Sequence, residues 1–129
     1  MKIKDAVWGF IVGDALGVPY EFSTRNMMKS NPAEDMIGYG TYNQPPGTWS
    51  DDTSMMLCVL ENIINKGDIN DLANLFLKMV NEGYMTPHGE LFDIGITTSS
   101  ALNNIKRGAK PSMSGLKNEM SAGNGSLMR

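Results

Sequence analysis

The chain has 129 residues, of which 41% are apolar, and its formal net charge is −3. This length fits one domain with a real hydrophobic core, and the acidic balance argues against a nucleic-acid or membrane surface built from basic patches. No apolar run suits a signal peptide or a transmembrane span, so we expect a soluble cytoplasmic protein that contacts neither nucleic acid polymers nor membranes. Cys58 is the one cysteine, which excludes an internal disulfide, and its apolar neighbours predict a buried thiol.

The first predicted helix covers residues 4–18, where apolar residues recur at helical spacing before Pro19 ends the run. Four small residues interrupt it, Gly9, Gly13, Ala15 and Gly17. Glycine inside a helix costs about 1 kcal/mol relative to alanine, so these positions predict close approach of another helix or of a ligand. Asp14 lies among them, and it can be a structural cap or acceptor as well as part of a site.

A long loop is predicted over residues 23–49, which are rich in Gly, Pro, Asn, Ser and Thr and show no sustained periodicity. Loops of this length in compact domains are functional or disordered. Glu21 lies just before the loop, where its carboxylate could reach a metal ion, and a plain surface position is the alternative.

The second predicted helix begins after Ser50, which serves as N-cap, and ends near Gly67. Asp51 and Asp52 fall in the first turn, where negative charge suits the positive end of the helix. Helical spacing assigns the buried stripe to Met56, Leu60, Ile63 and Ile64, with Met55 and Val59 widening it.

The run from Ser50 to Thr53 allows two interpretations. It can be a well-made helix start, because acidic first turns are common. It can also be a metal site, because a cap needs one oxygen acceptor whereas four consecutive side chains here carry oxygen. Adjacent carboxylates repel each other unless a positive charge lies between them, and Mg²⁺ or Ca²⁺ prefers such oxygen ligands.

Two further helices are predicted, at residues 69–82 with Asn70 as cap and at about residues 97–106 with Gly108 as stop. Their inward positions are Leu72, Leu75, Phe76, Met79 and Val80 in the former, and Ala101, Leu102 and Ile105 in the latter. His88, the single histidine, lies in the loop between them, so no Ser-His-Asp or Cys-His relay can be assembled and we expect a surface residue. No strand alternation persists anywhere, and the fold class is therefore all-α.

The last residues contain Gly123-Asn124-Gly125, which lets backbone amides approach an anion closely. The segment is not a dinucleotide fingerprint, because no strand precedes it and the glycine spacing differs. An ordinary turn is the alternative interpretation.

Four motifs occur in order along the chain: Gly13-Asp14-Ala15-Leu16-Gly17-Val18-Pro19-Tyr20-Glu21, Trp49-Ser50-Asp51-Asp52-Thr53, Phe92-Asp93-Ile94-Gly95-Ile96-Thr97-Thr98, and Gly123-Asn124-Gly125-Ser126-Leu127-Met128-Arg129. Together they resemble the ADP-ribosylglycohydrolase family over essentially the whole chain. The resemblance implies an all-α orthogonal helical bundle. It also implies a hydrolase that removes ADP-ribose from a protein side chain or a small acceptor, with two Mg²⁺ or Mn²⁺ ions and metal-activated water.

By this resemblance Ser50, Asp51 and Asp52 match the metal-binding hydroxyl and carboxylate pair, with serine where threonine is more usual. Glu21 matches the acidic loop residue that assists catalysis or positions the substrate. Gly95 and Thr97 match positions that shape the pocket. The loop that holds ADP-ribose matches Ser121, Gly123, Asn124, Gly125, Ser126, Leu127 and Met128.

The sequence departs from the family in length, because family members are considerably longer and carry a second acidic motif, Asp-x-Asp-Thr, in their C-terminal part. No such motif occurs here, so we expect residues 1–129 to be the N-terminal portion of a truncated bundle whose second metal is lost or weak. Three explanations stay open: a fragment, a half that assembles with a separate C-terminal chain, and a degenerate binder. The alternatives to a hydrolase are a non-catalytic ADP-ribose or nucleotide binder and a structural helical module.

Overall fold

The computed structural model describes residues 2–121 together with residues 123 and 125. This part of the chain forms helices and 3₁₀ turns and contains no strand, which confirms the all-α prediction. The α-helices are α1 (Ile3–Gly17), α2 (Arg25–Ser30), α3 (Asp51–Ile64), α4 (Ile69–Glu82) and α5 (Ile96–Lys106). The 3₁₀ turns are η1 (Val18–Tyr20), η2 (Gly40–Tyr42), η3 (Pro111–Met113) and η4 (Glu119–Ser121).

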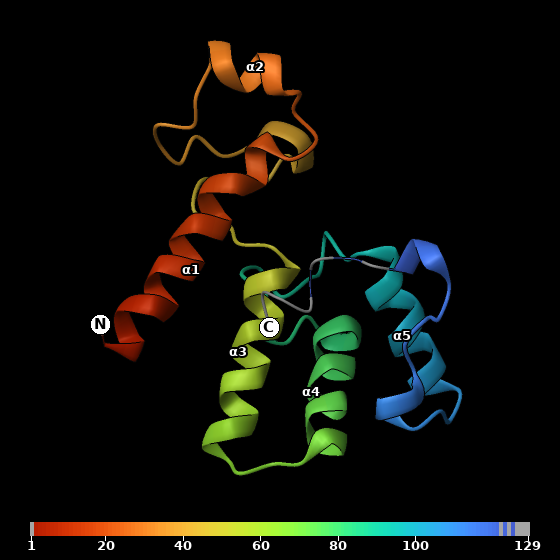
Figure 1. Cartoon of the computed structure of the whole chain (residues 1–129). Coiled ribbons are helices and arrows are strands. Elements are labelled where there is room, and N and C mark those ends of the chain that lie inside the picture. Colours follow the sequence, from red (N-terminus) through yellow and green to blue (C-terminus); the bar gives the residue numbers. More distant parts are fainter. Residues whose placement is uncertain (1, 122, 124, 126–129) are drawn as a thin grey trace.

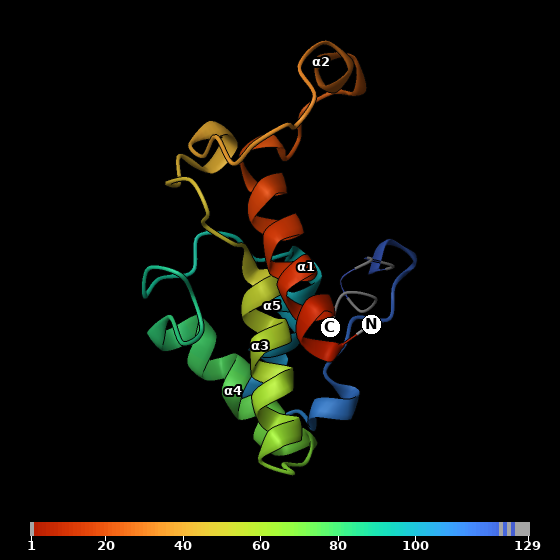
Figure 2. The same ribbon diagram turned by 90° about the vertical axis from the view of Figure 1, so that its left-hand side faces the viewer.

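Helices α3 and α4 lie side by side, and α5 packs against α4 on its other side (Figure 1). The first helix, α1, contacts α3, and η1 at its end packs against η2. Both views place α2 at the end of the molecule opposite the α3–α4 turn (Figures 1 and 2). The start of α3 therefore lies between α1 and the α4–α5 pair.

The core forms where α3 meets α4. Met55 and Cys58 of α3 pack against Met79 of α4, and all three side chains are at most 3% exposed. The burial of Cys58 confirms the prediction of a buried thiol. The predicted stripe of α4 is also confirmed, because the partly buried residues on this core include Leu72, Leu75, Phe76 and Val80.

The predicted buried stripe of α3 is wrong in its C-terminal half. Ile63 and Ile64 are 65% and 77% exposed. Residues 55–60 are all apolar, so periodicity alone does not decide which side of the helix faces the core. Positions 63 and 64 lie about 140° and 120° around the helix from the buried Cys58, on opposite flanks, which turns both away from α4.

The helix boundaries differ from the prediction at three places. Helix α3 ends at Ile64, before Gly67, and Lys66 takes the left-handed conformation with a φ of 53°. The cap of α4 is Asp68 rather than Asn70, because the Asp68 carboxylate accepts from the amides of residues 70 and 71. The predicted loop 23–49 contains α2, whose start is capped by the side chain of Thr24.

The glycines of α1 face open space rather than another helix. A Cβ at Gly9, Gly13 or Gly17 would meet no described atom within 4 Å, whereas Ala15 is buried. Gly13 and Gly17 line the cavity at the end of α1. Of the two predicted neighbours, helix or ligand, the described residues therefore leave room for a ligand.

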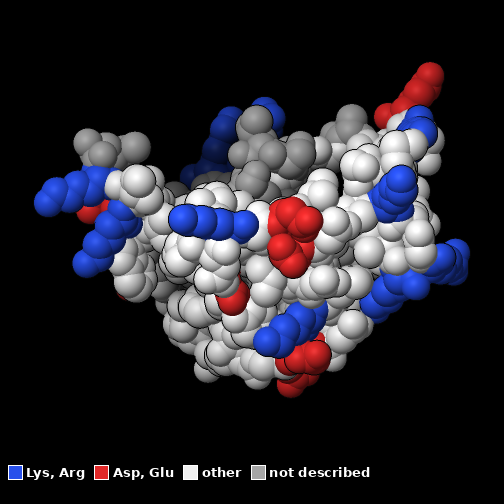
Figure 3. Space-filling view, turned by 90° about the horizontal axis from the view of Figure 1, so that it is seen from below, with Lys and Arg blue, Asp and Glu red and all other residues white. Residues whose placement is uncertain are grey.

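Surface charge is mixed on the side of the molecule seen in Figure 3. Basic and acidic side chains are interspersed there with uncharged ones, and no block of one sign forms on that face. Within the described residues, no helix combines the length and the apolar character needed to cross a membrane.

Candidate functional site

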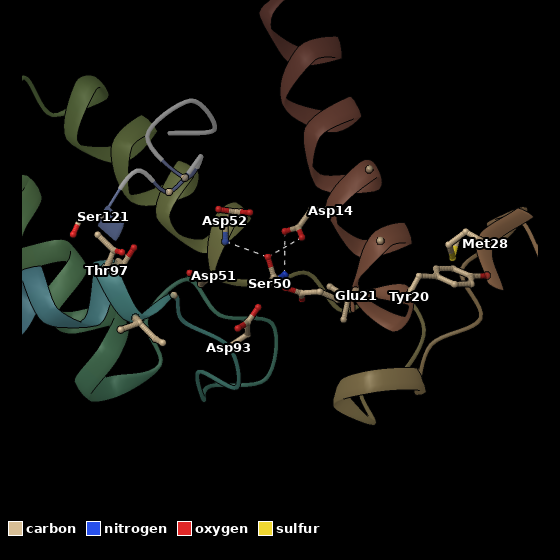
Figure 4. A pocket seen from close by; sticks show the side chains of 18 residues that line it. Asp14, Tyr20, Glu21, Met28, Ser50, Asp51, Asp52, Asp93, Thr97 and Ser121 are labelled. Atoms are coloured by element: carbon tan, nitrogen blue, oxygen red, sulfur yellow. Dashed lines mark hydrogen bonds between the residues drawn. The ribbon is translucent and has the colours of Figure 1, made fainter. Parts of the chain in front are cut away.

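A cavity of about 680 Å³ opens between the end of α1, the start of α3 and the start of α5 (Figure 4). Polar and small side chains dominate its wall. The described lining residues are Gly13, Asp14, Gly17, Val18, Tyr20, Glu21, Met28, Ser50, Asp51, Asp52, Asp93, Gly95, Ile96, Thr97, Thr98, Ser121, Gly123 and Gly125.

The start of α3 is held by a carboxylate from α1. The Ser50 hydroxyl and amide donate to Asp14 at 2.8 and 3.0 Å, and the Thr53 amide donates to Asp14 at 3.2 Å. The Ser50 hydroxyl oxygen also accepts from the Asp52 amide at 3.2 Å, which confirms Ser50 as the N-cap. Asp14 thus satisfies helix amides that have no partner within α3 itself.

This arrangement fixes the two acidic residues that follow the cap. Ser50 and Asp51 are 7% and 9% exposed, and the extended backbone of Ser50 leads directly into the first turn. Figure 4 shows Asp14, Asp52, Asp93 and Glu21 around Ser50. Because Asp14 is anchored on α1, the position of this first turn depends on the packing of α1 against α3.

Negative charge accumulates in the cavity. Five carboxylates line it, and none of the described lining residues is Lys, Arg or His. Glu21 is exposed as a whole residue, but partial burial of its carboxylate raises its pKa, and the charge of Asp93 adds to this increase, followed by Asp52 and Asp14. A hydrogen bond from Tyr42 opposes the increase. A cation entering this cavity would therefore relieve repulsion among groups that the fold forces together.

Tyr42 links two of these carboxylates. Its hydroxyl interacts with the carboxylates of both Glu21 and Asp93, and its pKa is raised far above 10, first by burial and then by the charges of Asp93 and Glu21. The sequence contained a signal for Asp93, which lies in a motif shared with the family, two residues before Gly95. No local pattern points to Tyr42, which lies in a loop.

The donor atoms match a hard divalent cation in kind. Carboxylate and hydroxyl oxygens are the ligands that Mg²⁺ and Mn²⁺ prefer, and the Ser50 oxygen, which accepts one hydrogen bond, has a second lone pair available. The set is incomplete in number. In the part of the chain that the structure describes, no three carboxylate, imidazole or thiol groups come together in a way that could hold a metal ion.

The structure brings together the predicted site residues that it describes. All of them line the one cavity: Glu21, Ser50, Asp51, Asp52, Gly95, Thr97, Ser121, Gly123 and Gly125. The other predicted loop residues, Asn124, Ser126, Leu127 and Met128, lie outside the described residues.

The single histidine lies elsewhere. His88 is exposed, as predicted, and its Nε2 lies 2.9 Å from the hydroxyl of Thr48. The indole of the next residue, Trp49, donates to the Met85 carbonyl at 3.3 Å. Both contacts fix the loop that precedes Ser50 against the loop after α4, and neither residue lines the cavity.

Comparison with known proteins identifies relatives of this chain. ADP-ribosylarginine hydrolase Tri1 of Serratia proteamaculans (strain 568) is 38% identical over 131 residues, which cover 99% of this chain and 34% of that protein. ADP-ribosylarginine hydrolase Tri1 of Pseudomonas putida (strain GB-1) is 34% identical, with the same coverage. The chain thus spans about a third of the length of these curated relatives.

A comparison with solved structures also finds an ADP-ribosylglycohydrolase-related protein. A chain of an ADP-ribosylglycohydrolase-related protein complex superposes with a TM-score of 0.76 and 34% sequence identity, over 96% of this chain and 38% of that chain. The fold type that the four motifs imply is confirmed by this match. The sequence model described as ADP-ribosylglycohydrolase matches residues 1–129. The chain belongs to the ADP-ribosylglycohydrolase family.

Proposed function

We propose that the chain supplies one acidic side of the active site of a metal-dependent hydrolase that removes ADP-ribose from a modified arginine or a small ADP-ribose conjugate. One observation carries the proposal: Ser50, Asp51 and Asp52 start a helix that Asp14 anchors, and they line a cavity with two further carboxylates. The substrate class is supported by the names of the relatives, which are ADP-ribosylarginine hydrolases.

Ser50, Asp51 and Asp52 would hold the metal ion, because their oxygens lie in one rigid helical turn at the cavity wall. A divalent cation, Mg²⁺ or Mn²⁺, supplies a Lewis acid and lowers the pKa of a bound water. The rigidity matters because ligands fixed before the ion arrives lose little freedom on binding it.

The other lining residues would bind and orient the substrate. The backbone at Gly123 and Gly125, which have no side chains in the way, would let amides approach the diphosphate. Gly95 and Thr97, at the start of α5, would shape the wall against the ribose. Glu21 would hold or accept a proton at its carboxylate, since its pKa is shifted upward, the direction that favours acid–base work by a carboxyl group.

The remaining metal ligands would come from outside the matched third of the family fold. We propose that an acidic Asp-x-Asp-Thr motif of a C-terminal segment or a separate C-terminal chain completes the set. Such a partner would also cover apolar side chains that the described structure leaves exposed, among them Ile3, Trp8 and Val12 of α1. A cytoplasmic location is part of this proposal, and the free thiol of Cys58 fits it.

Release of ADP-ribose from an ADP-ribosylarginine protein tests the proposal. The chain is assayed alone and with a co-expressed C-terminal portion of a relative, each with Mg²⁺, Mn²⁺ or a chelator. We expect metal-dependent release that rises when the C-terminal portion is present. No release under any of these conditions would contradict a hydrolase function.

A second candidate function is non-catalytic binding of ADP-ribose, favoured by the incomplete ligand set in the described residues. Calorimetric titration with ADP-ribose separates it from a purely structural module. Binding heat without hydrolysis would select the binder, and the absence of both would leave the structural module.

A further inference from the structure

Three segments that are distant in the sequence meet at Tyr42 of η2. Its ring packs against Phe22 and Phe92 at centroid distances of 6.4 and 5.3 Å, with 57° between the planes in each pair. Its hydroxyl interacts with the carboxylates of Glu21 and Asp93, the residues beside those two rings in the sequence, and it has one proton that it can donate to either of them. The tyrosine therefore contacts both neighbouring segments with its ring and with its hydroxyl.

The backbone around Glu21 is held to the same turn. The Thr41 hydroxyl donates to the Glu21 carbonyl at 2.6 Å. Gly40, whose φ is 51°, lies so close to Pro19 that a Cβ would overlap the Pro19 carbonyl. Turn η2 is thus docked onto the chain leading to Glu21, and these contacts set the distance between Tyr42 and Glu21.

The side chain of Glu21 needs such support. Glu21 is exposed, and the next residue, Phe22, adopts a φ of 63°, a conformation that few non-glycine residues take. Among the cavity carboxylates, Asp93 has the largest electrostatic effect on Glu21, and this effect is repulsive. A carboxylate on a strained, exposed turn and beside a like charge would swing into solvent unless a donor held it.

We propose that Tyr42 is a positioning residue, which holds the Glu21 carboxylate at the cavity by donating its hydroxyl proton to it, with Asp93 as the competing acceptor. The role of Glu21 in the reaction is taken from the proposed function. A phenol suits this task because its hydroxyl can donate to either carboxylate while the rings on both sides fix its direction. The alternative is that Tyr42 only fills space between Phe22 and Phe92.

A double-mutant cycle in the intact chain separates the two explanations, because Tyr42→Phe removes the hydroxyl and keeps the ring. The cycle combines Tyr42→Phe with Glu21→Ala, and the midpoint of urea unfolding is measured for each variant. Tyr39→Phe is the matched control, because it also removes a phenol hydroxyl and lies three residues before Tyr42. The Tyr39 side chain is 57% exposed and does not line the cavity. We expect Tyr42→Phe to lower the unfolding midpoint of the parent chain, and to lower that of the Glu21→Ala variant by less than half as much. Tyr39→Phe should change the midpoint equally in both backgrounds.

The second readout is kinetic. In the hydrolysis assay we expect Tyr42→Phe to reduce kcat about tenfold with KM within about twofold, and to cause no further loss in Glu21→Ala. Equal effects of Tyr42→Phe in the presence and absence of Glu21, in either readout, would overturn the proposal. A parent chain that releases no ADP-ribose would contradict the proposed function, and the unfolding cycle would then decide the Tyr42 proposal by itself.

Discussion

The carboxylate of Asp14 caps a helix to which it does not belong, by accepting hydrogen bonds from the hydroxyl and the amide of Ser50 at 2.8 and 3.0 Å. It also accepts from the Thr53 amide at 3.2 Å. Residue 14 is in α1 and residue 50 starts α3, so one side chain connects the two helices at the point where the cavity lies. The fold and the site therefore share this contact.

Replacing Asp14 should weaken the fold as well as the site. Asp14→Ala leaves a buried hydroxyl and two helix amides without their acceptor, and we expect a loss of about 3 kcal/mol in the free energy of unfolding. Asp14→Asn keeps one acceptor oxygen and should lose less. Asp68→Ala is the comparison, since Asp68 caps α4 from an exposed position within its own helix. Urea unfolding that ranked Asp68→Ala at or above Asp14→Ala would contradict this assignment.

The sequence predicted features that depend on residues within about four positions of one another. The Ser50 cap, the stripe of α4 and the burial of Cys58 are of this kind, and all are confirmed. Where local information was ambiguous the prediction was wrong. The all-apolar run in the middle of α3 suits any orientation, and Ile63 and Ile64 are exposed because α4 packs on the other side.

The candidate site was likewise predicted only in part. The motifs placed Glu21, Asp51 and Asp52 at one cavity, because their order matches a family whose members share the fold. The contacts that hold them cross more of the chain. Asp14 binds a residue 36 positions away. Tyr42 contacts two loops, and neither loop has a periodic pattern that would identify its partner.

The paired acids of α3 should account for metal binding. We expect Mg²⁺ or Mn²⁺ to raise the melting temperature of the chain. At a metal concentration 100 times the dissociation constant, the folded state gains about 2.7 kcal/mol of stability. The double variant Asp51→Ala, Asp52→Ala should lose this shift, since it removes both carboxylates from the first turn.

The chain contains a matched control for that experiment. Glu34 and Asp35 are also adjacent acids, but both are exposed and neither lines the cavity. Replacing them by alanine changes the net charge equally, so Glu34→Ala, Asp35→Ala should keep the metal-induced shift. Differential scanning fluorimetry with and without a chelator measures it, and an unchanged shift in the Asp51 and Asp52 variant would exclude these residues as ligands.

The thiol of Cys58 should react slowly for an electrostatic reason as well as a steric one. Burial raises its pKa from an ordinary value of 9.0 to about 11, and the charge of Glu61 adds to the increase. At pH 8 the thiolate fraction is then about 100-fold lower than that of an ordinary cysteine, before steric protection is counted. The rate of modification by a disulfide reagent measures it, with the urea-unfolded chain as the reference and Cys58→Ala as the blank.

The same shift sets a pH dependence of stability. The folded state holds the Cys58 proton more tightly than the unfolded state, because the folded pKa is the higher one. Its contribution to stability is therefore complete below pH 9 and is lost as the pH rises through about 11. Cys58→Ala should lack this part of the alkaline loss, and a folded thiol that reacts at pH 8 as fast as the unfolded one would contradict both expectations.

Thr48, just before α3, and Thr53, within it, allow the removal of a buried hydroxyl to be tested at two sites, one with a hydrogen-bond partner and one without a described partner. The Thr53 hydroxyl is fully buried and has no hydrogen-bond partner among the described residues, whereas the Thr48 hydroxyl, also buried, contacts the His88 ring. Because valine has the same shape without the oxygen, Thr53→Val should stabilise the fold by about 1 kcal/mol and Thr48→Val should destabilise it by a similar amount. Urea unfolding of the two variants measures both changes, and a destabilising Thr53→Val would mean that the hydroxyl has a partner in solution.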